Sequence, residues 1–130
     1  MPTIFTKIIN REIPAHIVAE NEMFIAILDI NPLVLGHVLV IPKVEKDYIF
    51  DLDDEVLKQM NVFAKHVSLA IRKTVSCKRI GVAVIGLEVP HVHMHLVPIN
   101  TADDLNFTRP KLSPTQQNLA EIAEKIKAAL

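Results

Sequence analysis

Three histidines recur at alternate positions in the stretch LEVPHVHMHLVPIN, between residues 87 and 100. His91, His93 and His95 make up half of the six histidines in the chain. Successive side chains of an extended strand point to opposite faces, so the three imidazoles would share one face and the intervening apolar residues the other. The spacing predicts a group of imidazoles on one side of a strand.

Two ordinary explanations of this group stay open from the spacing alone. The first is an exposed strand that happens to be rich in histidine, although histidine has no special preference for strands. The second is a metal site, since alternate strand positions bring imidazoles near one ion and histidine is a common zinc ligand. No second cluster of Cys, Asp or Glu obviously completes a coordination shell in the sequence.

A third explanation is chemistry at a phosphorus atom. A neutral imidazole, with an ordinary pKa of about 6.5, is a good nucleophile near neutral pH. It attacks phosphorus, releases a leaving group and is regenerated by water, which splits one displacement into two steps. Neighbouring imidazoles would hold its tautomer and donate hydrogen bonds to the phosphoryl oxygens. This explanation requires further residues elsewhere in the chain.

The elements that would position these side chains follow from apolar patterning. Pro14 disfavours helix for the residue before it, so the helix predicted near the N-terminus cannot run far past Ile13. Apolar side chains at three- and four-residue spacing predict an amphipathic helix over 51–75. Short apolar runs rich in Ile, Val and Phe predict strands at 16–20, 23–30, 36–42, 79–86 and 90–99.

The terminal segment 113–130 is predicted to be helical, with Ser113 starting a capping box that Gln116 completes and Pro114 at the first helical position. The run FIAIL at 24–28 is apolar throughout, which indicates a strand covered on both faces. The order of elements predicts an α+β fold: a five-stranded, mainly antiparallel sheet with a long helix packed on it, a short N-terminal helix and a C-terminal helix.

Composition narrows the class of protein. With 130 residues, half of them hydrophobic, the chain has the size of a single domain over 1–130. A formal charge of −1 excludes a global bias toward nucleic acid or anionic membranes. The single cysteine, Cys77, suits a reducing compartment, and charges near the N-terminus argue against a signal peptide. We therefore expect a cytoplasmic protein.

Two separated motifs carry a family resemblance that spans Ile4 to about Ile99. The first is IFTKIINREIPAHIVAENEMFIAILDINPLVLGHVLVIPK and the second is HVHMHLV. Together they resemble the histidine triad (HIT) nucleotide-binding family. The resemblance implies a homodimer with joined sheets and a purine nucleotide pocket in each subunit. It also implies hydrolysis or transfer at the α-phosphate of purine nucleoside phosphoramidates, through a nucleotidyl-histidine intermediate and without a cofactor or catalytic metal.

The same resemblance assigns roles to residues. His93 matches the nucleophile, His91 and His95 position the phosphate, and His37 matches a fourth histidine of the hydrogen-bond network. The nucleotide-binding set comprises Asp29 on the ribose, Gly86 near the phosphate, and an apolar wall around the base formed by Ile4, Phe5, Ile8, Ile27 and Leu39. Taken singly, His37 would be an ordinary strand-edge histidine, Asp29 a turn residue and the apolar set core.

The sequence departs from the family pattern in three places. Leu87 and Glu88 stand where many members carry a polar pair beside the phosphate, which leads to the hypothesis that Glu88 favours an amine leaving group. Thr3 and Thr6 replace the Cys-x-x-Cys of zinc-binding members, so that structural zinc site is not expected. The long C-terminal segment could set substrate choice or extend a dimer interface.

Two alternative functions therefore remain open beside the phosphoramidate hydrolase. The altered loop before the triad is compatible with a nucleotide-binding regulatory module that has little turnover. Hydrolysis of dinucleoside polyphosphates is the other alternative. The sequence predicts neither the base preference nor the physiological leaving group.

Overall fold

The computed structural model describes residues 2–130 and contains one five-stranded sheet. The elements are α1 (Ile4–Ile9), β1 (Ile17–Glu20), β2 (Phe24–Leu28), β3 (Val38–Pro42), η1 (Ile49–Asp51), α2 (Asp54–Thr74), β4 (Arg79–Ala83), β5 (Met94–Ile99), η2 (Ala102–Leu105) and α3 (Gln116–Ala129). The strands lie in the order β1-β2-β3-β5-β4, and every neighbouring pair is antiparallel. The predicted α+β class and order of elements are confirmed.

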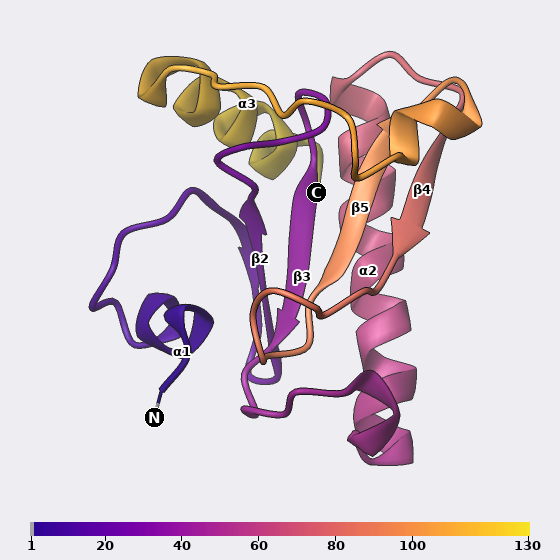
Figure 1. Ribbon diagram of the computed structural model, residues 1–130. Helices are drawn as coiled ribbons and strands as arrows, with labels where there is room; N and C mark the ends of the chain where they lie inside the picture. Colours follow the sequence, from indigo (N-terminus) through magenta and orange to yellow (C-terminus); the bar gives the residue numbers. More distant parts are fainter. Residues whose placement is uncertain (1) are drawn as a thin grey trace.

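The helices cover the sheet from two sides (Figure 1). The long helix α2 lies behind the strands with α3 near one end, and the short helix α1 lies on the opposite side of β2. Alternation along β2 explains this arrangement. Phe24, Ala26 and Leu28 enter one apolar cluster, whereas Ile25 and Ile27 enter another. All five residues of β2 are buried, as the unbroken apolar run predicted.

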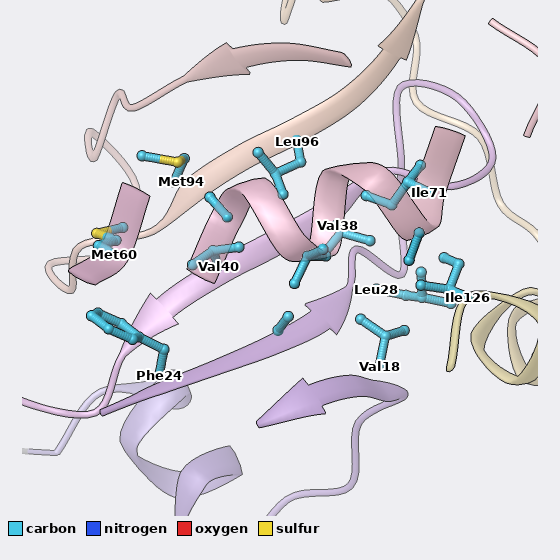
Figure 2. Packing of buried hydrophobic residues seen from close by; sticks show 14 of the residues in the cluster. Val18, Phe24, Leu28, Val38, Val40, Met60, Ile71, Met94, Leu96 and Ile126 are labelled. Carbon is cyan, nitrogen blue, oxygen red and sulfur yellow. The ribbon is translucent and has the colours of Figure 1, made fainter. Parts of the chain in front are cut away.

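The larger apolar cluster lies between the sheet and the two long helices. Figure 2 shows Val38 and Val40 of β3 and Leu96 of β5 facing α2, whose Met60 and Ile71 lie toward opposite ends of the cluster, with Ile126 of α3 near Ile71. Acidic residues in the first turn of α2 and basic residues in its last turn match the helix dipole. This rigid layer fixes β3 and β5, from which two of the candidate site residues project.

Two predicted boundaries are wrong. The strand predicted at 90–99 begins only at Met94, because the N–H of Val92 donates to the carbonyl of Lys46 at 2.7 Å instead of pairing with a strand. The end of the first helix at Ile9 agrees with the prediction that it cannot run far past Ile13. The cap of the last helix is Thr115 and not Ser113, since the Thr115 hydroxyl accepts the N–H of Asn118.

Within residues 2–130, no helix is both long enough and apolar enough to span a membrane. The longest helix, α2, is amphipathic, with Met60, Val67 and Ile71 buried against the sheet and charged residues on its outer face.

Candidate active site

A cavity of about 540 Å³ opens on the face of the sheet opposite α2. Its walls come from four segments: the loop after β2, the loop between β4 and β5, strand β5 itself, and the segment between η2 and α3. The lining residues are Asp29, Asn31, His37, Ile85, Gly86, Leu87, Glu88, His93, His95, Phe107 and Lys111. Five of the predicted site residues therefore meet in one cavity: Asp29, His37, Gly86, His93 and His95.

The triad does share one face, although only His95 lies within β5. Val92, Met94 and Leu96 belong to the core on the α2 side, so the predicted alternation continues through the irregular residues before the strand. His91 is fully buried and does not line the cavity, whereas His93 and His95 do. The ring centroids of His93 and His95 are 5.0 Å apart.

The first hydrogen-bond chain leads from a backbone amide to His95. The N–H of Leu33 donates to Nδ1 of His37 at 3.1 Å, so the ring proton of neutral His37 must be on Nε2. That Nε2–H faces Nδ1 of His95 at 2.9 Å and donates to it. The remaining proton of His95 is therefore on its own Nε2, which makes His95 a hydrogen-bond donor toward the cavity.

The second chain leads from a hydroxyl to His93. Nε2 of His91 lies 2.8 Å from the carbonyl of Pro42 and must donate to it, since a carbonyl only accepts. Nδ1 of His91 then accepts from the Thr3 hydroxyl at 2.7 Å. In turn, Nδ1–H of His93 donates to the backbone carbonyl of His91 at 2.7 Å, which leaves Nε2 of His93 with a free lone pair.

Burial keeps this network neutral. It lowers the pKa of His37 to about 3 and that of His95 to about 4, and the positive charge of Lys111 acts on both rings in the same direction. Burial also lowers the pKa of His91, against the hydrogen bond to Pro42, which raises it. At neutral pH the rings of His37, His91 and His95 are therefore uncharged, and the assignment of their protons follows from their partners.

Thr3 and Thr6, at the start of α1, tie the second chain to Glu45. One oxygen of Glu45 accepts the N–H of Thr3 at 3.1 Å and also the hydroxyl of Thr6. These hydrogen bonds lower the pKa of Glu45. The positions where zinc-binding relatives would carry cysteines thus form a hydrogen-bonded cluster around His91.

Asp29 lies at the end of β2 with one oxygen engaged and one oriented toward the histidines. Its Oδ1 accepts the N–H of Asn31 at 2.9 Å, and its Oδ2 is 3.7 Å from Nε2 of His37. Burial raises the pKa of Asp29, while the Asn31 hydrogen bond and the positive charge of Lys111 oppose that rise. Because His37 uses its proton on His95, Oδ2 keeps acceptor capacity for a ligand.

Gly86 occupies the loop between β4 and β5 with φ of +74°, a conformation that residues with a Cβ rarely adopt. A Cβ built there would meet only the Asp47 carbonyl at 3.8 Å, so the backbone conformation and not space requires glycine. Leu87 is 88% exposed, and Glu88 lines the cavity beside it. This loop brings a carboxylate, not a polar amide or hydroxyl, to the cavity wall.

The apolar residues predicted for the base wall lie beside the cavity and not in its lining. Phe5, Ile8, Ile27 and Leu39 are buried together in the smaller apolar cluster, whereas Ile4 is half-exposed outside it. The Phe5 ring is 5.0 Å from His93 in an edge-on arrangement, which connects this cluster to the histidines. Their role in base binding remains a prediction.

Four cavity residues were not expected from the sequence: Asn31, Ile85, Phe107 and Lys111. The Phe107 ring lies edge-on to His95, with centroids 4.6 Å apart. Phe107 and Lys111 belong to the segment after η2, which the N–H of Leu112 fastens to the Pro32 carbonyl at 2.9 Å. Only the unusual length of this C-terminal segment pointed toward the site.

One group of described residues brings potential metal ligands together: atoms of Asp29, His37 and His95 lie within 4.8 Å of one another. The facing nitrogens of His37 and His95 already share a proton in a 2.9 Å hydrogen bond. A cation bound by both nitrogens would have to displace that proton. The arrangement therefore fits a hydrogen-bonded pair better than a ligand set.

Comparisons with known proteins agree with this geometry. The HIT domain family model matches residues 10–102. An uncharacterized HIT-like protein of Borreliella burgdorferi is 34% identical over 131 residues, covering 95% of this chain and 94% of that protein. An adenosine 5'-monophosphoramidase of Saccharomyces cerevisiae is 38% identical over 96 residues, covering 73% of this chain and 61% of the yeast protein.

The fold has equally clear relatives among solved structures. A HIT-like protein from Bartonella henselae, described as involved in cell-cycle regulation and solved with an unknown ligand, superposes with a TM-score of 0.85. It is 32% identical, and the match covers 98% of this chain and 96% of that chain. The chain belongs to the histidine triad family of nucleotide-binding hydrolases and transferases.

Proposed function

We propose that the protein hydrolyses purine nucleoside phosphoramidates at the α-phosphate, through a nucleotide bound covalently to His93. The observation that carries this proposal is the pair of opposite tautomers in one cavity. His93 has a lone pair on Nε2 because its Nδ1–H is held by the His91 carbonyl. His95 has a proton on Nε2 because its Nδ1 accepts from His37. A nucleophile and a donor for a phosphoryl oxygen therefore lie side by side.

In the first step, Nε2 of His93 uses its lone pair to form a bond to phosphorus. The bond from phosphorus to the leaving nitrogen breaks, and its electron pair goes to that nitrogen, which takes up a proton from solvent and departs as an amine. The phosphorylated imidazole gains positive charge, which the His91 carbonyl stabilises through the retained Nδ1–H. The Nε2–H of His95 stabilises the negative oxygens of the transition state.

In the second step, water forms a bond to phosphorus and loses a proton to solvent. The bond from phosphorus to Nε2 of His93 breaks, and its electron pair returns to the nitrogen. The nucleoside monophosphate is released and the original tautomer is restored. The proton taken up by the amine equals the proton lost by water, so the cycle is balanced.

Three observations support a nucleoside as the group transferred. Oδ2 of Asp29 keeps acceptor capacity at the edge of the cavity, which suits the hydroxyls of a ribose. Phe5 and its buried neighbours lie next to His93 and would supply an apolar surface for a purine. The related yeast protein is an adenosine 5'-monophosphoramidase, which matches this class of substrate.

The direct test is turnover of adenosine 5'-phosphoramidate by the wild type and by His93→Ala. We expect the substitution to lower turnover by on the order of 10³-fold or more, because it removes the nucleophile. His66→Ala, on the exposed face of α2, is the matched control and should retain wild-type turnover. Equal turnover in His93→Ala and the control would contradict the assignment.

A homodimer that joins two sheets is the second part of the proposal. It is supported by the free edge of β4, where Val82 is 55% exposed, since an unpaired strand edge readily pairs with another chain. On the neighbouring helix α2, Val62 and Leu69 are half-exposed and two helical turns apart. Light scattering should give twice the mass of one chain, and Val62→Glu with Leu69→Glu should give the mass of one.

A nucleotide-binding module with little turnover is the competing function. It is favoured by one observation: the loop at residues 86–88 brings Leu87 and Glu88 to the cavity, and neither side chain donates a hydrogen bond to a phosphate. Calorimetric titration with AMP and GMP, beside a turnover assay over several leaving groups, separates the two. Tight binding without hydrolysis of any substrate would favour the module.

We also propose a cytoplasmic location, on the basis of a single cysteine that has no intramolecular partner for a disulfide. The test is to fractionate cells that express the protein and to detect it in each fraction with an antibody. Recovery outside the cytoplasmic fraction would contradict the proposal.

A further inference from the structure

The segment that follows η2 brings a cation to a cavity whose triad side is otherwise neutral. The segment crosses the sheet on its way to α3 (Figure 1), and the hydrogen bond from Leu112 to the Pro32 carbonyl fastens it beside the loop after β2. The Phe107 ring of this segment lies edge-on to His95. The ammonium of Lys111 lies 5.9 Å from the centroid of the Phe107 ring. Lys111 is thus held at the edge of the site.

The position of the ammonium is fixed by its own segment. Nζ of Lys111 donates to the carbonyl of Phe107 and, at 3.2 Å, to the carbonyl of Arg109. An ammonium has three N–H donors, so one donor and the full positive charge remain available. Within residues 2–130, no carboxylate forms an ion pair with Lys111.

The charge of Lys111 acts across the cavity. It lowers the pKa of His37 and of His95, and it opposes the burial that raises the pKa of Asp29. The negative charge of Glu88 instead raises the pKa of Asp29. The cavity is therefore lined by one cation, Lys111, and by a second carboxylate, Glu88. A ligand with matching charges would be bound by both.

We propose that Lys111 binds an anionic group on the leaving amine, so that the preferred substrates are phosphoramidates whose amine carries a negative charge such as a carboxylate. This inference rests on the proposed hydrolysis at His93. The α-phosphate itself is served by His93 and His95, whereas Lys111 is held beside Phe107 at the edge of the cavity. The carboxylate of Glu88 would attract the nitrogen of the same leaving group, because the released amine becomes an ammonium at neutral pH.

The test compares two substrates that differ in one charge: adenosine 5'-phosphoramidates of glycine and of glycinamide. The ratio of their kcat/KM values is measured for the wild type and for Lys111→Met, which keeps the length of the side chain and removes its charge. We expect the substitution to lower the ratio by about fivefold to tenfold, mainly through a higher KM for the glycine substrate. Lys111→Arg should restore most of the ratio.

Lys125→Met, on the exposed surface of α3, is the matched control and should leave the ratio unchanged. The wild-type preference for the glycine substrate should also shrink as ionic strength rises from about 0.01 M to 0.15 M, because salt screens an exposed charge. An equal loss on both substrates in Lys111→Met, or no loss, would overturn the inference while leaving the proposed hydrolysis intact. Failure of the wild type to hydrolyse either substrate would overturn the proposed function and this inference with it.

Discussion

Two pairs of histidines meet in the candidate site, and they present opposite atoms to it. In one pair, buried His37 donates to Nδ1 of His95 and leaves a proton on the outer nitrogen. In the other, the backbone carbonyl of His91 accepts from Nδ1 of His93 and leaves a lone pair on the outer nitrogen. His93 and His95 are two residues apart in sequence, and each is 8% exposed.

The difference between these pairs shows that spacing alone does not set the role of a histidine. His93 and His95 have the same side chain, the same face and similar burial, so their chemistry differs only through the partner of Nδ1. A third group also contacts each supporting histidine: the Leu33 amide donates to the ring of His37, and the Thr3 hydroxyl donates to the ring of His91. Loss of the contact to His37 should alter the pair of His37 and His95 alone, and loss of the contact to His91 should alter the pair of His91 and His93 alone.

The largest effect is expected at His37. His37→Phe removes the donor to His95 and leaves the Leu33 amide without its acceptor. We expect turnover of adenosine phosphoramidate to fall by about 100-fold, and the free energy of unfolding to fall by about 1–3 kcal/mol. Steady-state kinetics and urea unfolding measure the two effects.

His37→Gln provides the control, because its amide both accepts from Leu33 and donates to His95. It should recover most of the turnover that His37→Phe loses. A Gln variant that folds normally yet has the activity of the Phe variant would show that the hydrogen bond to His95 is not what His37 contributes.

A smaller effect is expected in the second pair. Thr3→Val removes the hydroxyl that donates to Nδ1 of His91 and leaves this buried nitrogen without a partner, so the ring is held at Nε2 alone. We expect kcat to fall by about tenfold. The loss of the α1 cap should also cost about 1 kcal/mol of stability. Thr3→Ser keeps the hydroxyl and should restore kcat; a Ser variant as slow as the Val variant would contradict a positioning role for this bond.

The last prediction concerns the dependence of stability on pH. The pKa values of about 3 for His37 and about 4 for His95 lie below the ordinary 6.5, so between pH 6.5 and about 4 the unfolded chain binds protons that the folded chain excludes. Their contribution to stability is therefore complete above about pH 6.5. It decreases on acidification, by about 1.4 kcal/mol per pH unit for each histidine.

Urea unfolding of the wild type and of His37→Gln at several pH values between 7 and 5 measures this dependence. The variant has lost one of these two histidines, so its free energy of unfolding should change less steeply with pH. The difference in slope should correspond to the uptake of about one proton on unfolding. Identical slopes for the two proteins would show that His37 is protonated as easily in the folded chain as in the unfolded one.

Much of this arrangement could be predicted from the sequence because it depends on local periodicity. The run FIAIL predicted a strand covered on both faces, and β2 is buried at every residue. Alternation around the triad correctly placed Val92 and Met94 in the core and the histidines opposite. The meeting of His37 with His95 required the family resemblance in addition, since 58 residues separate them.

The remaining features depend on contacts between distant segments that no short pattern encodes. Thr3 meets His91 across 88 residues. Lys111 reaches the cavity because Leu112 pairs with Pro32, an irregular contact between two loops. The late start of β5 follows from a hydrogen bond between Val92 and Lys46, where local strand propensity yields to tertiary structure.

The proposed mechanism depends on His93 and His95 being held as opposite tautomers. Long-range ¹H–¹⁵N NMR spectra of the protein, labelled with ¹⁵N at histidine and recorded at neutral pH, report the protonated nitrogen of each ring. Assignment with His93→Ala and His95→Ala identifies the two sets of signals. We predict a proton on Nδ1 of His93 and on Nε2 of His95, and a proton on Nε2 of His93 would contradict its role as the nucleophile.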